Sequence, residues 1–158
     1  MELFLAQNHS AMTHLPIAAS IMAAFAALIG LYVNRRELFR IWAILSLTAF
    51  ITVLPTIITG IAAAKGRFNE EGQPYIQKGL FVDWAPGNSR IFQHQALGIG
   101  GTILSGILAV IAVARLRGRE PNRFLVALLT VLLAILWGIG GHLGGAELWS
   151  PDTFPAFQ

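Results

Sequence analysis

The sequence predicts an all-α integral membrane protein, a single four-helix bundle domain that spans residues 1–158. Composition supports this class, because 55% of the residues are hydrophobic and 12% are charged, whereas soluble domains carry about 25% charged residues. Four uncharged stretches are each long enough to cross about 30 Å of hydrocarbon as a helix. They cover residues 15–33, 41–64, 91–114 and 124–146, and they leave 65–90 as the one sizeable loop.

Charge asymmetry predicts how these helices are oriented. The two short connections hold seven arginines and two glutamates, whereas the tails and the loop 65–90 hold four basic and six acidic residues. The arginines are Arg35, Arg36, Arg40, Arg115, Arg117, Arg119 and Arg123. Because basic loops stay in the cytoplasm, we expect both termini and the long loop on the outer, periplasmic or lumenal side. The predicted location is the bacterial cytoplasmic (inner) membrane. The arginines are topological signals, so the lipid bilayer is a predicted partner and nucleic acid is not.

All four histidines are expected near the outer membrane face, where they could form one site. They are His9, His14, His94 and His142. A single histidine at a helix end is more often an interfacial hydrogen-bonding residue than a ligand. Ionisable residues from three separate segments at one depth, however, indicate a functional site. The absence of cysteine excludes disulfides, thiolate metal sites, iron–sulfur clusters and covalently attached c-type haem.

The stretch HSAMTHLPIAAS, residues 9–20, predicts which of the first two histidines enters the site. Pro16 suits the first turn of a helix, which places His14 at the helix entry, pointing inward over the bundle. His9 lies five positions earlier, about 500° away around a helix. We therefore expect His9 to reach the site only if residues 9–13 form a loop.

Glycines beside the other histidines have two interpretations. Gly98 lies one turn after His94 and Gly138 one turn before His142, so each shares a face with its histidine. Such positions leave room for a flat macrocycle against the helix. Small residues also allow transmembrane helices to approach closely, and this structural interpretation stays open.

Four motifs resemble a known bacterial family. They are the entry His9-x4-His14-Leu15-Pro16, the pair Thr59–Gly60, the stretch His94-Gln-Ala-Leu-Gly, and GHLGG at Gly141–Gly145. Together they are similar to the family catalogued as "domain of unknown function 2231". The resemblance implies a small four-helix membrane protein that is associated with redox proteins, since some members are fused to c-type cytochrome or Rieske domains. The chain departs from the family pattern at Ser10, where proline is usual, and at Ala146, which displaces the acidic residue to Glu147.

Three hypotheses about function follow. The first is a b-type haem held by His94 and His142, or by either with His14, with propionates directed toward Arg90 or Lys78. Such a protein would transfer electrons in or beside a respiratory or photosynthetic complex.

The second hypothesis is a copper or zinc site built from His9, His14, His94 and His142, with Met12 or Glu147 nearby. The third is a cofactor-free accessory or assembly subunit of a larger membrane complex. The sequence contains no catalytic constellation, so an electron carrier or accessory subunit is favoured over a stand-alone enzyme.

Overall fold

The computed structural model describes residues 8–68, 74–76 and 90–148, and their side chains over 8–61 and 93–144. The described elements are α2 (His9–Tyr32), α3 (Arg36–Lys65), β1 (Gly66–Phe68), β2 (Pro74–Ile76), α4 (Arg90–Leu116) and α5 (Arg123–Leu148). Each of the four helices is long and apolar enough to cross a membrane. The predicted four helices, each long and apolar enough to span a membrane, are therefore confirmed, while the bacterial inner membrane and the side on which the termini lie stay predictions.

Two predicted helix starts are wrong. The first helix begins at His9 rather than at residue 15, and the second begins at Arg36 rather than at residue 41. The uncharged stretches mark the part of each helix that is apolar enough to lie in hydrocarbon, but the helical backbone continues through the polar residues beyond it. In the predicted loop 65–90, β1 and β2 pair antiparallel, with Gly66 opposite Ile76 and Phe68 opposite Pro74.

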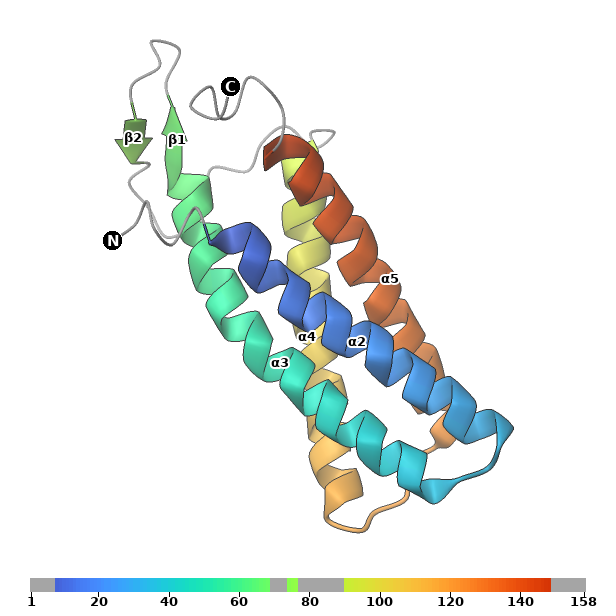
Figure 1. The fold of residues 1–158 in the computed structure, drawn as a ribbon. Helices are drawn as coiled ribbons and strands as arrows, with labels where there is room; N and C mark the ends of the chain where they lie inside the picture. The colour runs from blue at the N-terminus through green and yellow to red at the C-terminus, as the bar shows by residue number, and fades with distance from the viewer. Residues whose placement is uncertain (1–7, 69–73, 77–89, 149–158) are drawn as a thin grey trace.

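The helices form a closed ring in which α2 and α4 lie diagonally across from each other. Helix α2 packs against α3 and α5, and α4 packs against the same two neighbours (Figure 1). The short connections 33–35 and 117–122 lie at one end, which we call the arginine end. The opposite end, where α2 and α4 begin and α3 and α5 finish, is called the histidine end.

The core runs between these ends and combines small residues on α2 with large ones on its neighbours. Ala27 on α2 and Trp42 on α3 are completely buried. A Cβ added at Gly30 would lie 2.9 Å from Cε2 of Phe39, so the absence of a side chain lets α2 and α3 meet closely. Trp42 Nε1 donates a hydrogen bond to Thr130 Oγ1 at 2.9 Å, which joins α3 to α5 inside the bundle.

Polar contacts hold the arginine end together. Arg115 on α4 is buried, and it donates hydrogen bonds to Glu120 Oε1 and to the carbonyl oxygen of Arg36, each at 3.1 Å. Arg123 on α5 donates to Asn34 Oδ1 at 2.8 Å, and its guanidinium lies 5.4 Å from the centre of the Phe39 ring. These contacts connect α3, α4, α5 and the first short connection.

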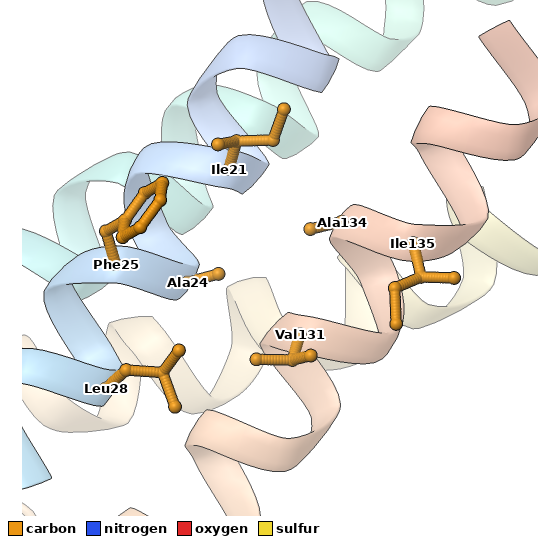
Figure 2. Close-up of a pocket in the computed structure, with 7 residues that line it drawn as sticks. All are labelled: Ile21, Ala24, Phe25, Leu28, Val131, Ala134 and Ile135. Carbon is orange, nitrogen blue, oxygen red and sulfur yellow. The ribbon is translucent and has the colours of Figure 1, made fainter. Parts of the chain in front are cut away.

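An apolar groove lies between α2 and α5, at about the middle of both helices. Its volume is about 280 Å³. Figure 2 shows the seven side chains that line it: Ile21, Ala24, Phe25, Leu28, Val131, Ala134 and Ile135. None of the seven carries a polar group, so this groove offers no ligand to a metal.

Candidate functional site

Two histidines meet inside the histidine end. The rings of His9 on α2 and His94 on α4 have centroids 6.4 Å apart, and their planes are inclined by 82°. The His9 residue is only 8% exposed, and His94 is half-buried. Because α2 and α4 are the diagonal pair of the ring, this contact crosses the interior of the bundle.

His94 is fixed by the end of α5. Its Nδ1 lies 2.7 Å from the carbonyl oxygen of Gly140. A carbonyl oxygen only accepts hydrogen bonds, so Nδ1 carries the proton, and in the neutral ring Nε2 keeps its lone pair. Gly144, one turn later, lies against the same ring, since a Cβ there would be 2.6 Å from His94 Cε1. The position therefore requires glycine if the imidazole is to keep this place.

His9 is fixed in the same way by the end of α3. Its Nδ1 lies 3.1 Å from Thr59 Oγ1. The Thr59 hydroxyl lies 2.9 Å from the carbonyl oxygen of Pro55 and donates its hydrogen within its own helix, so its oxygen accepts from His9 Nδ1–H. A Cβ added at Gly60 would lie 2.9 Å from His9 Cε1. In its neutral form His9 also keeps a lone pair on Nε2.

The two halves of the chain thus repeat one arrangement. In each, a histidine near the start of the first helix has a hydrogen bond with the second helix, at the Thr59 hydroxyl or the Gly140 carbonyl. In each, a glycine of that second helix, Gly60 or Gly144, lies against the ring. A serine eleven residues after each histidine, Ser20 or Ser105, is fully buried. All four helices therefore contribute to the site, two with an imidazole and two with a hydrogen-bond acceptor and a glycine.

The structure corrects the prediction for the first two histidines. Residues 9–13 are helical, yet His9 reaches the site, while His14 is exposed and donates from Nδ1 to the carbonyl oxygen of Ser10. The two histidines do lie on different faces, as the five-residue spacing requires. Spacing alone does not determine how a helix is rotated about its axis, and in the structure it is His9, not His14, that lies beside His94.

The remaining predicted site residues are not gathered around this pair. His142 is exposed, and a Cβ at Gly98 or at Gly138 would meet no atom within 4 Å. Arg90 begins α4, but its side chain, Lys78 and the side chain of Glu147 lie outside the described part of the chain. Within the residues described, no three histidine, aspartate or glutamate side chains come together as a metal site.

Sequence reasoning missed the hydrogen-bond acceptors. Thr59 was part of a motif, and Gly144 belonged to GHLGG, but neither was assigned to a histidine. The available signal was glycine near the ends of the second and fourth helices, at Gly60 and Gly144. A position without a side chain leaves space in which a ring from a neighbouring helix can lie.

Comparisons with models of protein families, with curated proteins and with solved structures found no match. The arguments about function below therefore rest on the residues and geometry of this chain.

Proposed function

We propose that this chain is a membrane electron carrier, in which His9 and His94 would hold a b-type haem. The contact between these two histidines across the bundle interior carries the proposal. The pair replaces the combinations of His94, His142 and His14 that the sequence favoured.

The separation of the two rings fits a shared metal ion. Two imidazoles that bind one ion from opposite sides, with metal–nitrogen bonds of about 2.0 Å, have ring centroids about 6 Å apart. The rings of His9 and His94 have centroids 6.4 Å apart.

The hydrogen bonds at Nδ1 also suit metal ligands. A histidine that binds a metal through one ring nitrogen usually donates the other N–H to a carbonyl, carboxylate or water, which fixes the tautomer and the ring rotation. His94 has this bond to Gly140, and His9 has it to Thr59. Both rings therefore keep Nε2 as the nitrogen available to a metal.

The number of ligands favours haem over zinc. Zinc sites take three or four protein ligands, whereas haem iron needs at most two side chains because the porphyrin supplies the others. The described residues bring two imidazoles together and no larger set. Haem also needs space beside its ligands, and Gly98, one turn after His94, leaves open space on that face.

The role of the chain follows from these positions. Bound haem would supply one-electron exchange. His9 and His94 would hold the iron, while Thr59 and the Gly140 carbonyl would keep the rings from rotating. Because the pair lies at the histidine end, which is the predicted outer side, we propose exchange with a respiratory or photosynthetic redox partner on that side.

The test is the visible spectrum of the protein purified after expression with ample haem, oxidised and then reduced with dithionite. We expect a Soret band and sharp reduced α and β bands of a six-coordinate haem. His9→Ala and His94→Ala should each lose the six-coordinate spectrum, whereas Gln93→Ala, an exposed neighbour on α4, should keep it. A wild-type protein without a Soret band would refute haem binding.

Two further variants test the assignment of ligands. Thr59→Val removes the acceptor of His9 Nδ1–H and should weaken haem binding about tenfold or more, while Thr59→Ser should restore it. If His142→Ala abolished the spectrum and His9→Ala left it intact, the ligand pair proposed here would be wrong. Stoichiometric copper in a protein that lacks haem would assign the same two imidazoles to copper instead.

A further inference from the structure

We propose that the groove between α2 and α5 is a second site, which binds an isoprenoid quinone or quinol. The apolar tail would lie in the groove, and the ring would lie between His14 and His142 at its upper end. These two histidines were predicted as site residues, and the haem proposal leaves both unused. The quinone's role as electron donor or acceptor rests on the proposed function, but its binding does not.

The groove fits an uncharged hydrocarbon tail. All seven lining residues are apolar, and they come from facing sides of the two helices (Figure 2). Phe25 and Ile135 are 60% and 51% exposed, so the groove opens outward to the lipid rather than into the core. A membrane-soluble ligand could therefore enter it sideways from the bilayer.

Helix register places both exposed histidines above this groove. His14 lies seven residues before Ile21 on α2, and His142 lies seven residues after Ile135 on α5. Seven residues are close to two full turns, so each histidine shares the face of its groove residue and lies about 10 Å above it. Because α2 and α5 run in opposite directions, both histidines lie toward the histidine end.

The helix faces between the groove and the histidines are kept open by glycine. A Cβ at Gly138, which lies between Ile135 and His142, would meet no atom within 4 Å. On the inner side, Ile17 Cδ1 lies 2.8 Å from the position of a Cβ at Gly141, which brings α2 and α5 together behind this surface. The groove therefore has a wall behind it and open space in front of it up to His142.

The two histidines provide the chemistry that a quinone ring needs. His14 Nδ1–H donates to the carbonyl oxygen of Ser10, so in the neutral ring Nε2 accepts hydrogen bonds. It can accept one from a quinol hydroxyl, and when protonated it can donate one to a quinone carbonyl. His142 is exposed on the facing helix and offers the same two choices.

The charge distribution favours a quinone over a phospholipid. The arginines of the short connections lie at the opposite end of the bundle. Apart from Arg123 at the arginine end, the two helices that form the groove hold no lysine or arginine, and the basic residues Lys65 and Arg90 at the histidine end belong to α3 and α4. A phosphate group beside His14 and His142 would thus lack a basic partner on either helix, whereas an uncharged hydrogen-bonding ring is matched.

The experiment uses the purified full chain in nanodiscs of phosphatidylcholine, with an azido-benzoquinone that carries an isoprenoid tail as the photoaffinity probe. We expect adducts near His14 and His142, displaced by the same quinone without the azide. Ala134→Phe, which fills the groove, should lower adduct yield at least fivefold. His14→Ala should lower affinity about fivefold, the effect of losing one hydrogen bond. Val110→Phe, on an exposed face of α4, should change nothing.

Three outcomes would overturn the proposal. They are adducts spread over all lipid-exposed helices, unchanged labelling in Ala134→Phe, and displacement by phosphatidylglycerol as effective as by quinone, which would make the groove a phospholipid site. Circular dichroism and elution profile verify that Ala134→Phe is folded. Labelling that persists in His9→Ala without haem would separate this site from the haem site, so either proposal can fail alone.

Discussion

The two ends of the bundle both bury polar side chains, but they do so in different ways. At the arginine end, Arg115 and Arg123 reach groups in or beside the short connections, including Glu120 and Asn34. At the histidine end, His9 and His94 bond to the helices themselves and lie against glycines. One end is held by long flexible side chains and the other by rigid rings fitted to helix backbones.

This difference distinguishes polar contacts that join helices from polar groups that keep one ring nitrogen available. The terminal guanidinium nitrogens of Arg115 and Arg123 donate to acceptors in or beside the short connections, and these contacts join the helices. Each imidazole at the histidine end uses one nitrogen for support and keeps the other available. Each of these histidines has one ring nitrogen in a hydrogen bond and the other available, and it lies beside a second histidine. This is the arrangement expected of metal ligands.

The largest expected effect comes from adding one methyl group beside an imidazole. Gly144→Ala would place a Cβ 2.6 Å from His94 Cε1, so the ring must move and the haem content per protein should fall at least tenfold. Gly60→Ala should act in the same direction on His9. The measurement is haem absorbance per mole of purified protein.

Gly100→Ala is the matched control, because a Cβ there meets nothing within 4 Å and the residue lies on a different face of α4 from His94. It should keep its haem and gain slightly in helix stability. Equal haem content in Gly144→Ala and Gly100→Ala would show that the glycine at residue 144 does not position His94.

An intermediate effect is expected at the arginine end. Arg115→Met keeps the apolar stem but removes the donors to Glu120 and to the Arg36 carbonyl, which should lower the free energy of unfolding by about 1–3 kcal/mol. Unfolding in mixed detergent, followed by circular dichroism, measures the change, with Arg117→Met as the exposed control. The haem spectrum should be unchanged, and its loss would contradict the separation of the two ends.

The smallest effect is expected between the two ends. Trp42→Phe removes the hydrogen bond from Nε1 to Thr130 while keeping an aromatic ring in the core, so unfolding should become easier by about 1 kcal/mol. Thr130→Val and the double variant complete a cycle that isolates this bond. Full additivity of the two single changes would show that the bond contributes nothing.

Much of the fold could be predicted because the membrane restricts the choices. A helix satisfies every backbone group within one segment, so four uncharged stretches of sufficient length predict four helices. The predicted ends were less accurate, as at His9 and Arg36, because a helix continues beyond the hydrocarbon. The hairpin of β1 and β2 had no periodic signal in its short strands.

The sequence by itself determined the class of the protein, the number of its helices and the gathering of its histidines toward one end, since length, hydropathy and chain direction fix these. Only the tertiary structure decided that His9, and not His14, meets His94. Rotation of a helix about its own axis is set by packing against its neighbours, here by Thr59, Gly60 and Gly144, which lie far from the two histidines in sequence. The same packing leaves His14 and His142 on the outer faces of α2 and α5, above the apolar groove.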